Sequence, residues 1–321
     1  MRLMVLALDG VFDTGLTVFL DMFSTANELA AAQGIATPPF EIALVGVRPQ
    51  IRTALGLTAS VELADAVRKP DWVVVPALNT KQPERLVEAL GRPDVLDAMA
   101  QLRRWQAGGI GVAAACIGTF LLAEAGLLAG LEATTTWSHA PLFRQRYPDV
   151  RLDDGRMIVP AGRIVTAGAA MGHLDLALWL MRQASPEMAA VVARFMLVDR
   201  RPSQAQYVIP NHLAHADPLV ERFERWARAN LAAGFSLQEA AKALAVGPRT
   251  LQRRTEAVIG KSPLAFFQDM RVERAQHLIS IGQDLEAVTT EVGYADSATL
   301  RTLLRRRLGR GVRELRAEMQ L

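Results

Sequence analysis

The chain has 321 residues, of which 50% are hydrophobic and 21% charged, and its net charge is +3 at pH 7. This length and apolar content suit two domains with separate cores and exclude a disordered or low-complexity chain. The single cysteine excludes internal disulfides and cysteine-rich metal sites. Residues 1–8 lack the basic start and long apolar core of a signal peptide, and no apolar stretch is long enough to span a membrane, so we expect a cytoplasmic protein.

The first 181 residues alternate short apolar runs with amphipathic segments. Five runs predict strands, at 3–8, 41–47, 72–76, 111–115 and 163–166. Helices are expected between and after them, near 18–32, 83–90, 95–107, 117–125 and 173–181. This alternation predicts an α/β fold with a flavodoxin-like, mainly parallel sheet covered by helices on both faces.

The strand at 111–115 runs directly into a helix, with Cys116 at the turn. A thiol there lies at the positive end of the helix dipole, which favours the thiolate. The geometry is that of a nucleophile elbow, although the motif is looser than the Gly-x-Ser-x-Gly of hydrolases. Cys116 and Ile117 are therefore candidate ligand contacts, and the alternative is that Cys116 is a small buried hydrophobic residue.

The segment 116–130, the Ala-Thr-Thr-Thr-Trp stretch at 133–137 and Thr-Ala-Gly at 166–168 make this region similar to the ThiJ/PfpI family. That resemblance implies the class I glutamine-amidotransferase-like fold, with an acid and often a histidine beside the elbow cysteine. Here Gly15 stands at the position of the acid, with Asp13 nearby, and Thr136 stands where the histidine is common. His139 follows three residues later, about 10 Å further along and on the other face if the strand continues.

These departures argue against a complete catalytic set, so the site prediction contains no catalytic residue. The predicted ligand-binding residues of this domain are Cys116, Ile117, Asp13, Gly15, Thr136 and His139. His139 also fits a surface or helix-start position, and capping and packing explain His173 and Asp175. The histidines form no metal-binding pattern, since His212 and His215 lie in a proline-flanked segment without a partner cluster, and we expect neither a metal nor a cofactor.

A change of pattern marks the end of the α/β region, because no strand is expected after residue 181. Residues 186–197 predict a helix, and 199–218, with three prolines and polar residues, predict a linker. We therefore divide the chain into an α/β domain at 1–190, a linker at 191–216 and an all-helical domain at 217–321.

The helical domain begins with a helix-turn-helix pattern at 236–259. Ser236 and Glu239 predict a capping box, and the turn at 246–248 leads into Arg-Thr-Leu-Gln-Arg-Arg at 249–254. Leu251 and Val258 are expected to face inward. The outward side chains available to DNA are Arg249, Thr250, Gln252 and Arg253.

A second unit of the same plan occupies 285–307, after a long amphipathic helix at 263–281. Gly293 and Tyr294 make its turn, Asp296 is expected to cap the next helix, and Leu300, Leu303 and Leu304 anchor that helix. The outward side chains are Ser297, Ala298, Arg301, Thr302 and Arg305. Two such helices on one face of a duplex must be about one helical turn, roughly 34 Å, apart.

Four spaced motifs carry a second resemblance, at 249–254, 260–263, 271–275 and 292–296. Over roughly 217–316 the chain resembles the AraC/XylS family of DNA-binding domains, with Ala245 where the first turn usually has Gly and Gly247 where the cap is usually Ser. Taken together, the two halves resemble the GlxA subgroup of transcriptional regulators. This resemblance implies an operator in double-stranded DNA as partner.

The charge distribution agrees with that implication. Residues 217–321 carry 17 Lys and Arg against 13 Asp and Glu, which leaves 19 against 20 for residues 1–216. Arginines between Arg305 and Arg316 suit phosphate contacts, which are independent of sequence and sensitive to salt. Gln252 suits adenine and Arg253 suits guanine, so these two side chains are expected to contribute base specificity.

The expected function is that of a sequence-specific DNA-binding regulator whose first domain senses a small molecule. One alternative is a cysteine-dependent hydrolase or hydratase of the ThiJ/PfpI superfamily that carries a DNA-binding domain. An acid at 15 and a histidine at 136 would have favoured this enzyme. Another is a redox switch at Cys116. Superfamily members commonly pair through the α/β domain, so a homodimer is expected.

Overall fold

A computed structural model describes residues 1–33, 40–199, 201, 203–204, 217–308 and 311–317. The contacts within the chain divide it into two compact units, Met1–Ala205 and Gln206–Leu321. Helix α7 (Pro186–Phe195) and the buried Gln204 belong to the first unit, which extends beyond residue 190, where the sequence analysis places the end of the α/β domain. The remainder of the predicted linker, 205–216 with His212 and His215, lies outside the described residues.

The first unit is built on a seven-stranded sheet in the order β10-β11-β7-β6-β1-β2-β5. Every neighbouring pair is parallel except β10 and β11. The strands of this sheet are β1 (Arg2–Leu6), β2 (Glu41–Gly46), β5 (Glu62–Leu63), β6 (Trp72–Val75), β7 (Gly111–Ala115), β10 (Ile158–Ala161) and β11 (Ile164–Ala167). The chain order reverses between β1 and β6, and ligands of open α/β sheets bind at the carboxyl ends of strands beside such a point.

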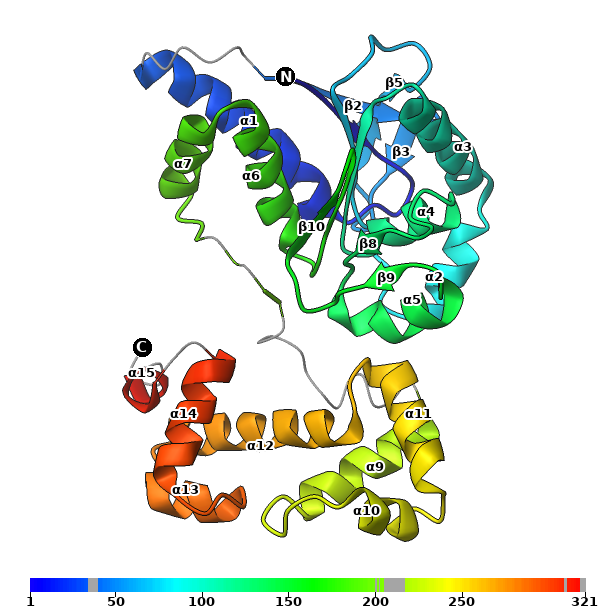
Figure 1. Ribbon diagram of the computed structural model, residues 1–321. Coiled ribbons are helices and arrows are strands. Elements are labelled where there is room, and N and C mark those ends of the chain that lie inside the picture. The colour runs from blue at the N-terminus through cyan, green and yellow to red at the C-terminus, as the bar shows by residue number, and fades with distance from the viewer. Residues whose placement is uncertain (34–39, 200, 202, 205–216, 309–310, 318–321) are drawn as a thin grey trace. The chain divides into compact units, whose positions relative to one another are not determined.

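Helices cover both faces of the sheet, so the predicted fold class is confirmed. One face carries α1 (Asp13–Gln33), α6 (Gly172–Ala184) and α7, and the other carries α2 (Pro83–Leu90), α3 (Pro93–Ala107), α4 (Gly118–Glu124) and α5 (Ala140–Arg146) (Figure 1). Alternate residues of the central strands supply the two cores. Leu3 and Val5 of β1 pack with the first set of helices, and Met4 and Leu6 pack with the second.

The short elements of this unit were missed by periodicity. They are the antiparallel pair β3 (Gln50–Arg52) and β4 (Thr58–Ser60), the parallel pair β8 (Glu132–Ala133) and β9 (Arg151–Leu152), the edge strands β5 and β10, the 3-10 helix η1 (Trp137–His139) and helix α5. Strands of two to four residues are too short to show an alternation of apolar and polar positions, and the seven residues of α5 make only about two turns.

The second unit is all-helical, as predicted. Its helices are α9 (Pro218–Ala229), α10 (Leu237–Ala243), α11 (Pro248–Ile259), α12 (Pro263–Ser280), α13 (Leu285–Glu291), α14 (Ser297–Leu308) and α15 (Val312–Ala317). Helix α12 runs between two groups, with α9, α10 and α11 at one end and α13, α14 and α15 at the other (Figure 1). Each expected helix-turn-helix segment is therefore a pair of helices, α10 with α11 and α13 with α14.

Side-chain caps fix where several helices of the C-terminal unit begin. Ser236 accepts a hydrogen bond from the Glu239 amide at 3.3 Å, and Asp296 Oδ1 accepts one from the Thr299 amide at 2.7 Å, as both expected caps require. Asp217 caps α9 through the amides of Leu219 and Val220, at 2.8 and 3.2 Å.

Buried Arg271 joins the two ends of the second unit. Its guanidinium donates to the Leu231 carbonyl at 2.8 and 3.1 Å and lies 5.0 Å from the Phe267 ring centroid and 4.9 Å from that of Tyr294. A Cβ at Gly293 would lie 2.4 Å from this guanidinium, so the turn between α13 and α14 requires glycine. In the described ranges of the chain, no helix is long and apolar enough to cross a membrane.

Candidate functional site

Cys116 lies at the carboxyl end of β7, with a left-handed backbone (φ 56°). An L-residue with such a φ is strained, which is typical of a nucleophile elbow. Close packing holds the turn in place, because a Cβ at Gly118 would lie 2.4 Å from the Val75 carbonyl oxygen. The Cys116 amide donates to the Ala167 carbonyl at 2.8 Å, which ties the elbow to β11. The predicted elbow geometry is therefore present.

The thiol is protonated rather than ionised at neutral pH, which corrects the expectation of a thiolate. Burial raises the pKa of Cys116 to about 11, although hydrogen bonds from the Ile117 backbone and the Thr136 side chain act in the opposite direction. Only 6% of the residue's surface is exposed, so loss of hydration outweighs the favourable amides at the start of α4. The predicted residues Ile117 and Thr136 are buried beside the thiol.

His139 is nearer to the elbow than the sequence indicated. Strand β8 ends at Ala133 and η1 follows, and His139 is buried rather than on the surface, with its ring centroid 6.3 Å from that of Phe120 in α4. Thr136 Oγ1 and Ser138 Oγ lie 3.2 Å apart, and Ser138 Oγ lies 3.1 Å from His139 Nδ1. Thr136 and Ser138 thus connect the thiol to His139 through a line of hydrogen bonds, which the spacing in the sequence did not reveal.

The position expected for an acid is closed by His173. A Cβ at Gly15 would lie 2.6 Å from His173 Nε2 and 2.9 Å from Phe12 Cδ1, so any larger side chain at 15 collides with this ring. His173 is buried, its Nδ1 lies 2.6 Å from the Ala170 carbonyl, and its Nε2 accepts from the Ala77 amide at 3.2 Å. Burial lowers the pKa of His173 to about 4, so the ring is neutral at pH 7.

Asp13, the remaining ligand candidate, begins α1 and is buried. Its Oδ2 accepts from the Leu55 amide at 3.0 Å, and its Oδ1 has no hydrogen-bond partner among the residues that the structure describes. The β3–β4 connection therefore holds Asp13 beside Leu55. The six ligand candidates are all buried around the carboxyl ends of β1 and β7.

Two residues of this region were missed by sequence reasoning, His173 and Gln204. His173 was interpreted as a packing residue at a helix start, and nothing local indicates that its ring fills the space above Gly15. Gln204 was placed in the linker. Its side chain is fully buried and donates through Nε2 to the Thr135 carbonyl at 2.8 Å. A polar residue among prolines gives no signal of such burial.

In the first helix-turn-helix unit, Leu251 is buried and Val258 half-buried on the inner side of α11. Arg249, Thr250 and Arg253 are exposed. Gln252 is half-buried, and its amide donates to the Glu256 carboxylate of the same helix, so it is less free for a base than expected. A base contact by Gln252 therefore uses the second amide hydrogen or the amide oxygen, or breaks this intrahelical bond.

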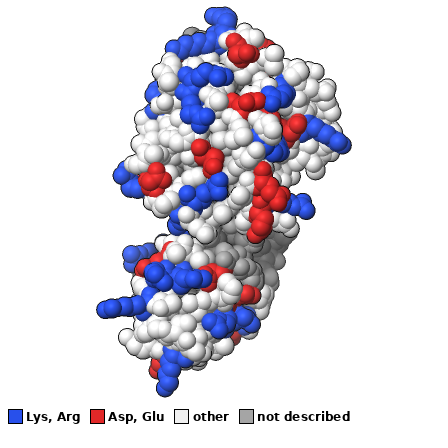
Figure 2. All heavy atoms as spheres, turned by 90° about the vertical axis from the view of Figure 1, so that its right-hand side faces the viewer, with Lys and Arg blue, Asp and Glu red and all other residues white. Residues whose placement is uncertain are grey.

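In the second helix-turn-helix pair, α13 with α14, Leu300 and Leu304 are buried and Leu303 is half-buried. Ala298, Arg301, Thr302 and Arg305 are exposed on α14, and Ser297 is half-buried at its start. Arg310, one of the expected phosphate contacts, lies outside the described residues. Lys and Arg side chains protrude from the surface of the C-terminal unit, the lower body in the space-filling view (Figure 2).

Comparison with known proteins identifies the C-terminal unit. A family model described as a helix-turn-helix domain matches residues 240–318. The chain is 28% identical over 196 residues to the HTH-type transcriptional regulator CdhR of Pseudomonas aeruginosa, covering 58% of this chain and 56% of CdhR. It is 27% identical over 210 residues to the HTH-type transcriptional regulator GlxA of Rhizobium meliloti, covering 60% of each. These matches span little more than half the length of either relative.

A solved structure is similar in fold to the larger part of this chain. A ThiJ/PfpI family protein from Pseudomonas syringae aligns with a TM-score of 0.51 and 18% identity, over 76% of this chain and 90% of its own. At that identity the likeness concerns the fold alone. The predicted combination of a ThiJ/PfpI-like fold with a helix-turn-helix domain is therefore confirmed.

Proposed function

We propose that this chain, a GlxA-type regulator in which a helix-turn-helix domain follows a ThiJ/PfpI-like domain, binds an operator in double-stranded DNA and senses a small molecule. The observation that carries the proposal is the pair of helix-turn-helix units in one domain. Each presents arginines on the exposed side of its second helix, Arg249 and Arg253 on α11 and Arg301 and Arg305 on α14. Such helices enter the major groove, where Arg recognises guanine.

The environment of Cys116 favours a sensor over an enzyme. The thiol is protonated, and His173 occupies the space in which an acid at position 15 would stand. The thiol therefore lacks the carboxylate at position 15 that the ThiJ/PfpI resemblance places beside the elbow cysteine. The proposed effector contacts are Cys116, Ile117, Asp13, Gly15, Thr136 and His139. Steady product release that disappears in Cys116→Ser would instead make the chain an enzyme.

We further propose that the protein works as a homodimer in the cytoplasm. Two copies place two DNA-binding domains on one operator, and two half-sites extend the sequence that is read. Cys116 is a free thiol, which fits a reducing compartment. Effector binding changes DNA affinity only by as much as the effector prefers one of two states of the protein.

The test is selection of DNA from a random pool by the purified full-length chain, followed by sequencing. A regulator enriches one motif, and the double variant Arg253→Ala, Arg301→Ala enriches none. The matched control is Arg103→Ala, which removes an exposed arginine from α3 in the first unit. Recovery of unrelated sequences by the wild-type chain would contradict operator recognition.

A further inference from the structure

The segment that leaves the first unit is docked onto it at three residues. Arg201 donates to the Met171 carbonyl at 2.8 Å and pairs with the Asp175 carboxylate. Ser203 Oγ donates to the Gly155 carbonyl at 2.6 Å, and the Gln204 amide donates to the same oxygen at 2.9 Å. Ser203 also forms an isolated antiparallel bridge with Arg156. The described part of 201–204 is therefore held by side chains as well as by backbone.

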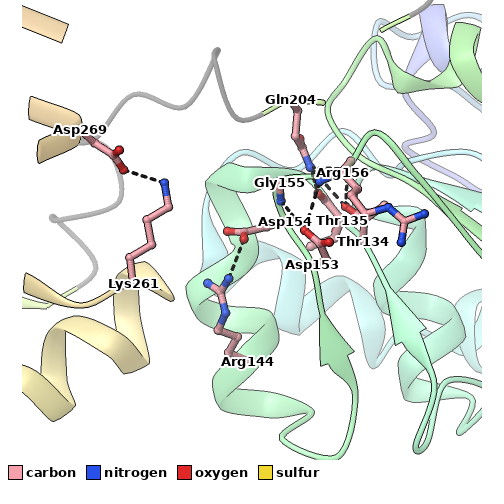
Figure 3. A network of polar contacts seen from close by, with 10 residues as sticks. All are labelled: Thr134, Thr135, Arg144, Asp153, Asp154, Gly155, Arg156, Gln204, Lys261 and Asp269. Atoms are coloured by element: carbon pink, nitrogen blue, oxygen red, sulfur yellow. Dashed lines mark hydrogen bonds and ion pairs between the residues drawn. The ribbon is translucent and has the colours of Figure 1, made fainter. Parts of the chain in front are cut away.

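The Gln204 side chain enters the first unit beside the elbow. Its Nε2 donates to the Thr135 carbonyl at 2.8 Å and lies 3.3 Å from Thr134 Oγ1, as the close-up view shows (Figure 3). A Cβ at Gly168 would lie 2.1 Å from Gln204 Nε2, so the space for this side chain exists because residue 168 is glycine. Gln204 Oε1 is buried without a hydrogen-bond partner in the described part of the protein.

The residues that hold Gln204 also hold Cys116. Thr135 offers its carbonyl to Gln204, and its hydroxyl donates to the Cys116 carbonyl at 2.7 Å. The next residue, Thr136, makes the side-chain hydrogen bond to the thiol. A group that enters beside the thiol and displaces Thr135 or Thr136 therefore also disturbs the hydrogen bonds that hold Gln204.

Burial makes this coupling necessary. All six predicted effector contacts are buried, so a molecule reaches the thiol after a local opening of the site. Arg201, Ser203 and Gln204 are held to the first unit by a few hydrogen bonds and an ion pair, whereas β7 and β11 at the elbow belong to the central sheet. Undocking this segment costs less than disrupting the sheet.

We propose that Arg201, Ser203 and Gln204 form a latch that is docked when the Cys116 site is empty and released when the site is occupied. This inference rests on the proposed function, because it describes how occupancy is passed on. Residues 205–216 join Gln204 to Asp217, the N-cap of α9. Release of the latch lengthens the connection that limits where the helix-turn-helix unit can lie relative to the first unit.

The first test uses iodoacetamide as the probe, since the chain contains one cysteine. The Cys116 sulfur displaces iodide to form a carbon–sulfur bond, and its proton passes to the buffer. On the full-length protein at pH 8.5, Gln204→Ala should raise the rate of this reaction at least fivefold, within the usual range of coupling between sites. Gln183→Ala, which removes an amide bonded to its own helix at Trp179, should leave the rate unchanged. Equal rates in the Gln204 variant and wild type would overturn the latch.

A second variant separates release of the latch from loss of a side chain. Gly168→Ala keeps Gln204 but places a methyl group in its space, so the rate should again rise. In the double variant the added methyl should have little further effect, because Gln204 is already absent. Gly172→Ala is the control, since its Cβ would make ordinary contacts, the shortest 3.5 Å to Met157 Sδ. Independent, multiplying effects of the 168 and 204 changes would contradict the latch.

The reciprocal measurement is hydrogen exchange at the Gln204 amide in wild-type protein. If occupancy of the site and docking of Gln204 oppose each other, alkylated Cys116 should also accelerate this exchange. Unchanged exchange would overturn the latch whatever happens at DNA. Affinity for the selected operator is measured on the same samples. Accelerated exchange with unchanged DNA affinity would keep the latch and reject its regulatory use, which separates this inference from the proposed function.

Discussion

A neutral histidine, rather than a carboxylate, occupies the space beside the elbow. His173 is fixed by the Ala170 carbonyl and the Ala77 amide, and it lies against Phe12 and Phe19 with ring centroids 5.8 and 6.0 Å apart. Protonation would convert the acceptor Nε2 into a second donor facing the Ala77 amide. Burial and the Ala77 amide therefore oppose the charged form, whereas the hydrogen bond to the Ala170 carbonyl favours it and is outweighed by burial.

This state predicts a loss of stability in mild acid. The folded pKa of about 4 lies below the unfolded value near 6.5, so the unfolded chain binds the proton first as the pH falls. Stability contributed by neutral His173 is complete above about pH 6.5 and is lost progressively towards pH 4, by about 3 kcal/mol in total. Urea unfolding of the first unit between pH 7 and 4 measures this slope.

The control variant is His173→Gln, which can donate and accept hydrogen bonds but does not titrate in this range. It should lower the stability at pH 7 and reduce the slope between pH 6.5 and 4. An unchanged slope would show that other groups cause the acid sensitivity. His277→Gln changes a histidine at the last turn of α12, in the other unit, and serves as the matched control. It should leave the pH dependence of the first unit's stability unchanged.

At the scale of single residues, the sequence predicted which residues form the elbow better than it predicted which side chains surround them. The elbow at Cys116 follows from a buried strand running into a helix, and its geometry is as predicted. His139 was misplaced because the prediction assumed a continuing strand, whereas β8 ends at Ala133 and a 3-10 helix follows. His173 and Gln204 were missed because each fills a space left by a distant glycine, and tertiary contacts of this kind have no local pattern.

Among the elements, the turn between α10 and α11 carries an avoidable strain. Ala245 has φ 55°, in the left-handed region, where an L-residue is less stable than glycine. Its amide bonds to the Lys242 carbonyl at 3.1 Å, and the following amide of Val246 bonds to Ala241 at 3.0 Å. The turn is thus maintained by backbone hydrogen bonds despite the side chain.

Ala245→Gly should therefore stabilise the C-terminal unit by about 1 kcal/mol, the left-handed cost less the added entropy of the unfolded glycine. Thermal unfolding of a fragment of residues 206–321 measures the change. Ala243→Gly, at the last residue of α10, is the control and should destabilise by about 0.5 to 1 kcal/mol. A loss of stability in Ala245→Gly would contradict the assigned backbone conformation.

The element pattern of the chain was largely predictable where elements are long. Helices α2 and α11 and strand β7 follow from apolar spacing, proline at the helix start and a continuous buried run. The paired strands β3 and β4 were not predicted, since three residues show no periodicity. Buried Arg271 was also not anticipated, because an arginine in an amphipathic helix is usually solvated.

At the scale of the molecule, positive charge and base recognition are separable. In the proposed function, the excess of basic residues in 217–321 is expected to supply affinity for any duplex, and particular side chains of α11 and α14 are expected to supply sequence preference. Arg254 differs from its neighbour Arg253, since it pairs with the Asp217 carboxylate and supports the start of α9. Adjacent arginines in one helix therefore have different expected roles.

Arg253→Ala should weaken binding to the selected operator by about 1 to 3 kcal/mol and binding to random DNA much less. The expected cause is loss of a two-point contact with guanine. Fluorescence anisotropy on both duplexes at several salt concentrations measures the difference. Arg306→Ala, another exposed arginine of this unit, should weaken both duplexes alike and flatten the salt dependence. Equal losses for Arg253→Ala on both duplexes would make it a phosphate contact.

The fit between Gly168 and Gln204 has a consequence for how related chains can diverge. A side chain at 168 and a glutamine at 204 compete for one volume, so the two positions cannot change in either order with equal ease. Shortening of residue 204 must come first, and it leaves a cavity that a later side chain at 168 can fill. Descendants of this chain that lose the glycine should therefore already carry a small residue at 204.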